Sequence, residues 1–284
     1  MDQNPFVDAN RPEEKEREGE LFDQGYYSEG VFRWWIEHPY RLHTLRHLVR
    51  FLKEERAVTN EELRVLEPAC GCGVNLTNLA RAFPDFKMVG VDVSSEGLAT
   101  GNQFGVGSYE IGDAENLPFE NEEFDICVCV AAAHHFSRDP RRFVWEMCRV
   151  LKPGGTLYLF EPCQNCRIPR WLRPLELAAK AILRALVLNR EFTGYGAIPH
   201  SPSEGAFLRE QVMESLLESG MHLIEHGYSE YMTEWARHLK RGFWIARLFD
   251  RLVPQRTPLT TPDADKPVSR IGGNKYYAIL EKSR

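Results

Sequence analysis

A short glycine-rich stretch of this chain carries the residue types of a ligand-binding turn. Residues 65–76 are VLEPACGCGVNL, in which an acid, Glu67, precedes a Gly-x-Gly turn made by Gly71 and Gly73. A second acid, Asp92, closes the next apolar segment 19 residues after Gly73. Glycine turns of this kind let the backbone approach a ligand, and a carboxylate at the end of the following strand can accept both hydroxyls of a ribose. The spacing therefore predicts a nucleoside cofactor.

Two adjacent histidines follow another apolar segment. In the sequence AAAHHF, His134 and His135 come directly after the apolar residues 124–133, FDICVCVAAA. An imidazole titrates near neutral pH and can take a proton from a hydroxyl nucleophile, so either histidine is a candidate catalytic base. A packing or capping role is the alternative, and the sequence does not rank the two residues.

The residues around the turn narrow the choice of cofactor. A phosphate-binding loop needs Lys followed by Ser or Thr after its last glycine, and here Val74 and Asn75 follow. A dinucleotide fingerprint needs a third glycine or alanine, and Leu76 weakens that interpretation without excluding it. NAD and S-adenosylmethionine both contain the ribose. Glu67 favours S-adenosylmethionine, because an acid there repels a pyrophosphate and attracts an ammonium or sulfonium group.

Strands alternate with helices through the middle of the chain. Residues 124–133 are almost wholly apolar, as in a central parallel strand. The alternation is typical of βαβ units. We therefore expect an α/β fold with a doubly wound, mostly parallel seven-stranded sheet and helical insertions late in the chain. The expected strands are 63–68, 87–94, 107–114, 124–133, 156–162, 221–229 and 274–282, and the expected helices between them are 75–84, 95–104, 139–151 and 203–220.

The chain divides into a polar amino-terminal segment and one larger domain. Residues 1–28 are acidic and are expected to form a flexible tail. Residues 29–284 have the mixture of apolar and charged segments that a folded domain needs. Within this domain we expect amino-terminal helices at 29–60, a cofactor-binding core at 63–162, and substrate-side insertions at 163–203 and 231–273.

Composition is that of a globular protein. The chain has 284 residues, of which 43% are hydrophobic and 27% charged. Its formal net charge of -6 does not favour nucleic acid as a partner, and it has no apolar run of 18 or more residues that could span a membrane. The amino terminus lacks a secretion signal, and the seven cysteines are an odd number. We therefore expect a cytoplasmic protein without a disulfide framework.

Four motifs in order give the chain a family resemblance. They are VLEPACGCG, VGVDVS, GDAENLPFENEEFDICVC and RVLKPGGTLYLFEP, all within residues 63–162. With them the chain resembles the class I S-adenosylmethionine-dependent methyltransferases, specifically the branch that includes ubiquinone- and biotin-pathway enzymes. The first motif alone is a weak signal, whereas the ordered set is highly specific. The resemblance implies a Rossmann-like fold, S-adenosyl-L-methionine as cofactor, and methyl transfer by in-line displacement.

The resemblance also assigns roles to the matching positions. One position departs from the family, since Ala69 stands where glycine is usual and its methyl group narrows the approach to the cofactor. The implied contacts are Glu67 for the methionine ammonium, Gly71 and Gly73 for the turn beneath the methionyl part, Asp92 with Val93 for the ribose, Asp113 with Ala114 for the adenine, and Val130 and Ala131 with Ala132 for the sulfonium side.

Other possible ligand groups have simpler interpretations. His43 and His47 are four residues apart on an expected helix, but no third ligand is near in the sequence, so no metal site is predicted. Cys163 and Cys166 lie beyond the fifth expected strand, where packing, metal binding and disulfide chemistry all stay open. The remaining cysteines are expected to fill tight or buried positions.

The acceptor must be inferred from the more variable parts of the chain. DNA amino-methyltransferases usually carry Asp/Asn-Pro-Pro-Tyr after the fourth strand, whereas this chain has AAAH. Basic residues outnumber acidic ones in 166–191 and 237–256, and both segments also contain large apolar residues. They predict a small-molecule or amphiphilic acceptor, methylated on oxygen or carbon, that is enclosed by a cap or presented at a membrane surface. Ordinary helices with a solvated basic face are the alternative.

Two other functions stay open at this point. One is a nicotinamide-dependent oxidoreductase on a similar sheet, against which Glu67 and Leu76 argue. The other is a scaffold that binds the cofactor without catalysis, which turnover to S-adenosylhomocysteine would exclude. The sequence does not indicate the oligomeric state.

Overall fold

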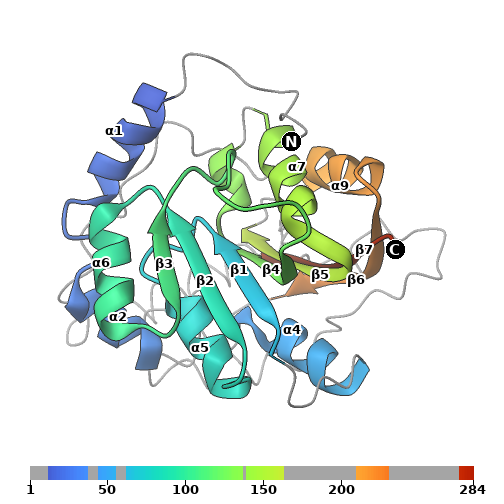
Figure 1. Ribbon diagram of the computed structural model, residues 1–284, viewed down its shortest axis with the longest axis horizontal. Coiled ribbons are helices and arrows are strands. Elements are labelled where there is room, and N and C mark those ends of the chain that lie inside the picture. Colours follow the sequence, from blue (N-terminus) through green and yellow to red (C-terminus); the bar gives the residue numbers. More distant parts are fainter. Residues whose placement is uncertain (1–11, 38–43, 56–61, 137–138, 163–208, 230–274) are drawn as a thin grey trace, which may run out of the picture.

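The computed structural model describes residues 12–37, 44–55, 62–136, 139–162, 209–229 and 275–284, which are built around a seven-stranded sheet (Figure 1). The strand order is β3-β2-β1-β4-β5-β7-β6, in which β1 to β5 pair in parallel and β7 runs antiparallel between β5 and β6. The predicted doubly wound, mostly parallel sheet is thus confirmed. The strands are β1 Arg64–Pro68, β2 Lys87–Asp92, β3 Ser108–Ile111, β4 Phe124–Val130, β5 Leu151–Pro162, β6 Met221–Ser229 and β7 Lys275–Lys282.

Helices cover both faces of the sheet, because the central strands are apolar on both sides. In β4, Ile126 and Val128 belong to one core cluster, whereas Cys127 and Cys129 belong to the other. Helices α4 and α5 complete the first cluster, and α7 and α9 complete the second. The described helices are α1 Pro12–Phe22, α2 Glu29–Glu37, α4 Arg46–Arg50, α5 Val74–Ala82, α6 Ser95–Phe104, α7 Arg141–Val150 and α9 Arg209–Glu218, with a π-helical turn at Phe51–Glu55 and a 3-10 turn at Ala133–Phe136.

Strand β5 begins at Leu151, earlier than the strand expected at 156–162. Phe124 of β4 pairs with Leu151, and the next pair of the ladder joins Ile126 to Thr156. The intervening residues of β5 therefore leave the ladder and return to it. A Pro-Gly-Gly sequence predicts a change of chain direction, and the sequence alone does not tell an excursion within a strand from a turn that precedes one.

Part of the expected flexible tail is a helix. The sequence predicts a mobile segment over 1–28, whereas the structure has helix α1 at Pro12–Phe22. The carboxylate of Asp23 accepts the hydroxyls of Ser94 and Ser95, both at 2.6 Å, and so joins the end of α1 to the start of α6. Glutamate and lysine are good helix formers, and a helix that packs on a domain gains the stability it lacks alone. This interaction with distant residues explains the difference.

Some expected features lie outside the described residues. These are the insertions at 163–203 and 231–273, the pair Cys163 and Cys166, and His43. Within the described ranges, no helix has both the length and the apolar character needed to cross a bilayer.

Candidate active site

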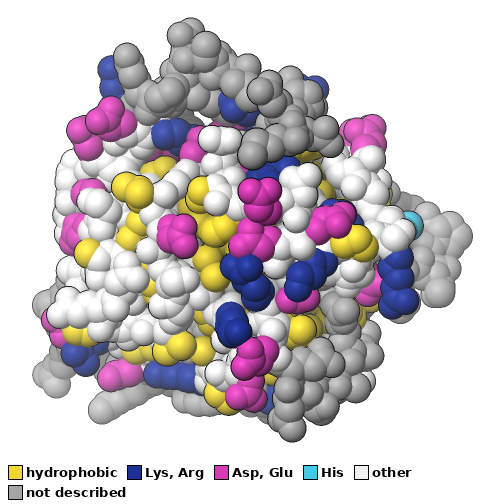
Figure 2. Space-filling model, viewed as in Figure 1, with side chains coloured by type: hydrophobic (Ala, Val, Ile, Leu, Met, Phe, Trp, Pro, Cys, Tyr) yellow, Lys and Arg dark blue, Asp and Glu magenta, His cyan; other side chains and the backbone are white. Residues whose placement is uncertain are grey.

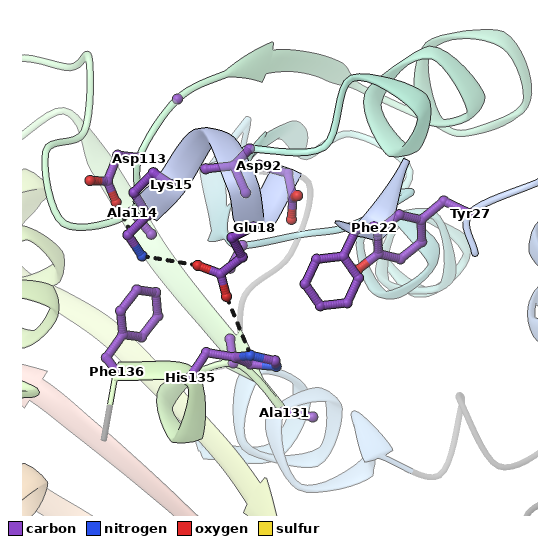
Figure 3. Close-up of a pocket in the computed structure, with 14 residues that line it drawn as sticks. Lys15, Glu18, Phe22, Tyr27, Asp92, Asp113, Ala114, Ala131, His135 and Phe136 are labelled. Atoms are coloured by element: carbon purple, nitrogen blue, oxygen red, sulfur yellow. Dashed lines mark hydrogen bonds and ion pairs between the residues drawn. The ribbon is translucent and has the colours of Figure 1, made fainter. Parts of the chain in front are cut away.

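A pocket opens at the carboxyl ends of the parallel strands, and α1 forms one of its walls (Figure 3). It is partly open to solvent. This edge of a doubly wound sheet is where such folds bind ligands. The described residues that line it are Lys15, Glu18, Phe22, Tyr27, Ala69, Asp92, Val93, Gly112, Asp113, Ala114, Ala131, Ala132, His135 and Phe136.

Asp92 places a buried carboxylate in the wall of the pocket. Its Oδ2 accepts the backbone N–H of Gly71 at 2.6 Å, and its Oδ1 accepts that of Ser94 at 2.9 Å. Burial raises the pKa of Asp92 to about 6, because the charged form loses hydration. The side chain therefore ties the glycine turn to the end of β2, at the position where the sequence predicts a ribose.

The glycine turn depends on the left-handed backbone of two residues. Gly71 has a φ of +56° and Gly73 a φ of +71°, which glycine adopts without strain. A Cβ at Gly73 would lie 2.1 Å from the ring of Tyr109, so the turn also needs the missing side chain. Gly73 is the N-cap of α5, whose first residue is Val74. The amino end of a helix thus follows the turn directly, as in nucleoside-binding sites of this topology.

We expect Gly73→Ala to lower the free energy of unfolding by about 2 kcal/mol, because it adds left-handed strain and overpacking. Gly30→Ala is the matched control, since Gly30 is exposed in α2 and an added Cβ would meet nothing within 4 Å. That control should leave stability equal or raise it by up to about 1 kcal/mol. Denaturant unfolding measures both variants, and equal loss in the two would contradict the specific role of the turn.

An aromatic side chain that the sequence did not identify covers the turn. A Cβ at Gly71 would lie 2.6 Å from the ring of Tyr27, and one at Gly97 would lie 2.9 Å from the same ring. Tyr27 also stacks on Phe22, with ring centroids 5.8 Å apart. Burial raises the pKa of the Tyr27 hydroxyl well above its usual value, so this group stays neutral. Tyr27 therefore covers the glycine turn, and Phe22 packs against Tyr27.

Glu67, which was expected to serve an ammonium group, is buried and is not among the lining residues described. Its Oε1 accepts Nδ2 of Asn75 at 2.7 Å. Because Asn75 lies in the first turn of α5, this bond joins β1 to α5 across the glycine turn. The contact of Glu67 with a ligand stays a prediction.

Two alanines at the edge of the pocket have a backbone conformation usual for glycine. Ala69 follows β1 and Ala131 follows β4, and each has a φ of +54°. A left-handed alanine costs about 1–2 kcal/mol, which accounts for the glycine usual at position 69 in the resembling family. Both alanines line the pocket, so this strain lies where a ligand would approach.

The residues expected to hold the adenine follow β3. Oδ1 of Asp113 accepts the backbone N–H of Glu115 at 2.9 Å, and Ala114 between them is buried. Nζ of Lys15 lies 3.8 Å from Oδ1 of Asp113 and 3.4 Å from Oε2 of Glu115. Helix α1 therefore contacts the same loop that the resemblance assigns to the adenine.

The surroundings of the two histidines differ. His135 lines the pocket, whereas Nδ1 of His134 lies 2.9 Å from Oε2 of Glu161 at the end of β5. Oε1 of Glu161 accepts the backbone N–H groups of Ala132 and Ala133, both at 2.8 Å. Burial alone would raise the pKa of Glu161, but His134 and these N–H groups bring it below its usual value. His134 thus helps to hold the loop after β4, and His135 faces the pocket.

Six of the ten residues predicted to bind the cofactor line the pocket, and four do not. Ala69, Asp92, Val93, Asp113, Ala114 and Ala131 are the six. Glu67, Gly71, Gly73 and Val130 are the four, and Val130 is buried in the core cluster that α4 and α5 complete. The lining residues that the sequence analysis missed are Lys15, Glu18, Phe22, Tyr27, Gly112 and Phe136.

Most of the charged side chains that line the described part of the pocket are acidic. Glu18, Asp92 and Asp113 contribute carboxylates, and Lys15 contributes an ammonium group. Such a wall favours a cationic ligand and disfavours a pyrophosphate. On the outer face drawn in Figure 2, acidic and basic side chains are instead interspersed, and the described part shows no broad basic surface of the kind that binds nucleic acid.

The described cysteines and histidines do not form a metal centre. Among the residues that the structure covers, no group of three His, Cys, Asp or Glu side chains is placed to hold a metal ion. His47 stacks on Tyr277, with ring centroids 3.7 Å apart. Burial raises the pKa of Cys148 to about 12, which favours the neutral thiol. Cys70, Cys72, Cys127, Cys129 and Cys148 are buried free thiols.

Residues of the sheet and pocket match a known protein family. Residues 66–159 match a family model described as a methyltransferase domain. This match supports, for about a third of the chain, the resemblance to methyltransferases that the motifs predict. The matched span runs from β1 to β5, so it contains the glycine turn, Asp92, Asp113 and His135.

Similar curated proteins include methyltransferases of mycobacteria. Over 111 residues the chain is 35% identical to the phthiotriol/phenolphthiotriol dimycocerosates methyltransferase of Mycobacterium leprae, which covers 38% of this chain and 41% of that protein. Over 134 residues it is 34% identical to the fatty-acid O-methyltransferase of Mycolicibacterium smegmatis, which covers 46% of this chain and 48% of that protein. The chain thus spans about half the length of the curated relatives it matches.

Similar solved structures share the fold. One is an S-adenosylmethionine-dependent methyltransferase of Thermotoga maritima, described as a possible histamine N-methyltransferase, with a TM-score of 0.53, 17% identity, and coverage of 93% of this chain and 99% of that one. Another is the [4+2]-cyclase SpnF, also with a TM-score of 0.53 and 17% identity, and coverage of 95% and 96%. Because the second is named for a different reaction, this likeness is evidence of fold and not of chemistry.

The residues of the methyltransferase domain fit its cofactor. A buried carboxylate, Asp92, stands at the end of β2 where the ribose is expected, and the two glycines of the turn beside it have no side chains. The acidic wall suits the positive charge of a sulfonium or an ammonium group. Val93 and Ala114 add apolar surface near Asp113, as a purine ring needs.

Proposed function

We propose that the chain transfers a methyl group from S-adenosylmethionine to a hydroxyl oxygen of a lipid-like acceptor, with His135 as general base. The observation that carries this proposal is that His135 lines the same pocket as Asp92 and Ala131. An imidazole in that place is next to the cofactor cradle, where the reacting oxygen must also lie.

The residues of the chain divide the work of binding and proton transfer. Asp92 would accept the ribose hydroxyls, and Asp113 would accept the adenine amino group, with Ala114 against the ring. When bound, S-adenosylmethionine would supply an electrophilic methyl group, and the electron pair of the broken carbon–sulfur bond would leave with sulfur in S-adenosylhomocysteine. His135 receives the proton of the acceptor hydroxyl, so that an oxygen lone pair is available for the new bond to carbon. Holding the reacting groups about 3 Å apart supplies most of the rate.

The acceptor class is inferred from two observations. Relatives of the matched domain are named for dimycocerosates and for fatty acids, which are hydrophobic compounds. The pocket has aromatic side chains at Phe22, Tyr27 and Phe136, which suit an apolar chain. The basic segments at 166–191 and 237–256 lie outside the described residues, so contact with an anionic membrane surface stays a hypothesis that liposome sedimentation at low salt can test.

Two other functions make different predictions. A nicotinamide-dependent oxidoreductase would bind a pyrophosphate, which the carboxylates of Glu18, Asp92 and Asp113 disfavour. A scaffold would bind S-adenosylhomocysteine without turnover, and a fold alone does not distinguish it from an enzyme. Calorimetry with both cofactors addresses the first, and a turnover assay addresses the second.

We expect S-adenosylhomocysteine to form when the chain is incubated with S-adenosylmethionine and a long-chain 1,2-diol in detergent micelles, and the diol to gain one methyl ether. Mass spectrometry detects both products. Palmitic acid is the comparison acceptor, because a carboxylate is already ionised at neutral pH and needs no base. Methylation of palmitic acid alone would overturn the hydroxyl acceptor, and turnover of neither probe would overturn the lipid-like acceptor.

A further inference from the structure

Helix α1 is fixed to the methyltransferase domain on both sides of its pocket-facing part. Gly19 packs so closely that a Cβ would lie 2.6 Å from the carbonyl oxygen of Val93. Asp23 caps the start of α6, since its Oδ1 also accepts the backbone N–H of Glu96 at 2.9 Å. Lys15, at the other end, lies near the loop after β3, as described above. The two side chains between Lys15 and Asp23 that line the pocket, Glu18 and Phe22, therefore have defined positions.

Glu18 is the acid of α1 that enters the pocket (Figure 3). It is 8% exposed, whereas Glu16 and Glu20 on the same helix are exposed. Its Oε1 lies 3.7 Å from Nδ1 of His135, and its Oε2 lies 3.4 Å from Nζ of Lys15. Removing a carboxylate from water is costly unless charged or hydrogen-bonding groups compensate. The contacts of Glu18 thus set it apart from the solvated acids of α1.

We propose that Glu18 is a positioning residue for His135, so that α1 completes the general base of the domain. This inference rests on the proposed function. A carboxylate beside Nδ1 favours the tautomer with its hydrogen on Nδ1, which leaves the lone pair of Nε2 to accept the proton of the acceptor. The same carboxylate stabilises the imidazolium that then forms. A separation of 3.7 Å is an ion-pair distance, and catalytic pairs commonly shorten in the reactive complex.

The other groups around His135 are consistent with this role. The ring of His134 lies 4.3 Å away between centroids, and that of Phe22 lies 6.0 Å away. His134 is bound to β5 through its own Nδ1, and Phe22 is apolar. Lys15 pairs with Glu18 and with the loop after β3. Among the described residues, Glu18 is therefore the carboxylate in ion-pair contact with His135.

The proposal has a consequence for the chain as a whole. The span that matches the methyltransferase family begins at residue 66, whereas Glu18 belongs to a helix that precedes it. If Glu18 positions the base, then the core would hold the cofactor but depend on α1 for full turnover. Displacing α1 should then lower kcat in addition to any effect on binding.

The test is the titration of His135 followed by NMR in the full chain, with Glu18→Gln compared with the parent. The imidazole signal of His135 is assigned by its loss in His135→Gln. We expect Glu18→Gln to lower the titration midpoint, which corresponds to a proton affinity about 3–10-fold weaker, because the stabilising carboxylate is gone. Glu16→Gln and Glu20→Gln are matched controls on the same helix and should leave the midpoint unchanged. An unchanged midpoint in Glu18→Gln would overturn the proposal.

A double-mutant cycle gives a second and independent measurement. On the long-chain diol, Glu18→Gln should lower kcat about tenfold. It should have no further effect in a His135→Gln background, since Glu18 acts through His135. Additive losses would overturn the proposal, because they would mean that Glu18 acts on another group. The NMR titration needs no acceptor, so failure of the proposed function would appear as absent turnover with the midpoint shift still present.

Gly19→Ala provides a variant that moves α1 without removing Glu18. Its added Cβ would clash with the carbonyl oxygen of Val93, so α1 must shift. We expect the same lowering of the His135 midpoint as in Glu18→Gln, while the signals of the sheet residues keep their positions. A normal midpoint in a variant whose α1 signals have moved would contradict the dependence of His135 on α1.

Discussion

His135→Gln should lower turnover by about 100-fold or more, because a hydroxyl nucleophile loses the group that takes its proton. The affinity for S-adenosylhomocysteine should stay within about threefold of the parent, since glutamine retains much of the volume of the imidazole and Asp92 and Asp113 are untouched. Steady-state kinetics on the long-chain diol and calorimetry with S-adenosylhomocysteine measure the two quantities separately. A variant that keeps full turnover would show that His135 packs in the pocket without acting as base.

His134→Gln is the control for this prediction, because the two histidines are adjacent but differently bound. His134 is joined to Glu161 at 2.9 Å, and Glu161 in turn accepts two backbone N–H groups of the loop after β4. Removing the hydrogen-bonding partner of a buried carboxylate should lower the free energy of unfolding by about 1–3 kcal/mol. Turnover measured well below the unfolding temperature should fall less than in His135→Gln. A larger loss of turnover in His134→Gln than in His135→Gln would instead assign the role of general base to His134.

The sheet could be predicted from the sequence because its signals are local. The apolar run over 124–133 indicates a central parallel strand, and the helix expected at 95–104 is found at Ser95–Phe104. The ends of a strand were less predictable where they depend on pairing with a neighbouring strand. The turn residues in 151–155 lie within β5, because Leu151 already pairs with Phe124 before the chain leaves the ladder. Local pattern alone does not show such a pairing.

The pocket could be predicted only in part, because four of its fourteen described lining residues, Lys15, Glu18, Phe22 and Tyr27, come from the distant amino-terminal segment. Asp92 and Ala131 were found from motifs that end strands, which is a local signal. Glu18 and Tyr27 belong to a segment whose acidic composition indicated disorder. The signal that could have found them was the group of aromatic residues at 22, 26 and 27, since a solvated tail has few aromatics. Their positions depend on contacts with α6 and β2, which no local pattern contains.

Asp92→Asn should weaken the binding of S-adenosylhomocysteine by about 10–100-fold, the equivalent of losing about 1.5–3 kcal/mol in hydrogen bonds to a charged group. The reason is twofold. The ribose hydroxyls lose an ionised acceptor, and the N–H groups of Gly71 and Ser94 must share one amide oxygen where they now have two carboxylate oxygens. Calorimetry at pH 8 measures the loss. If Asp92→Asn binds S-adenosylhomocysteine as tightly as the parent, Asp92 does not contact the cofactor.

The pH dependence of the same affinity tests the charge of Asp92 directly. Burial raises its pKa from the usual 3.8 to about 6, so the free protein binds a proton there as pH falls through 6. If the ribose needs the ionised form, the dissociation constant should be nearly constant from pH 8 to 7 and about tenfold larger at pH 5. As pH falls, the affinity should weaken, whereas the contribution of Asp92 to the free energy of unfolding should increase. Because the raised pKa means that the folded state binds the proton more tightly than the unfolded state, the contribution of Asp92 to stability rises as pH falls from about 6 towards 4. Asp92→Asn removes this titration, so its weak affinity should lose the slope between pH 8 and 5. A slope that persists in Asp92→Asn would assign the titration to another carboxylate of the pocket.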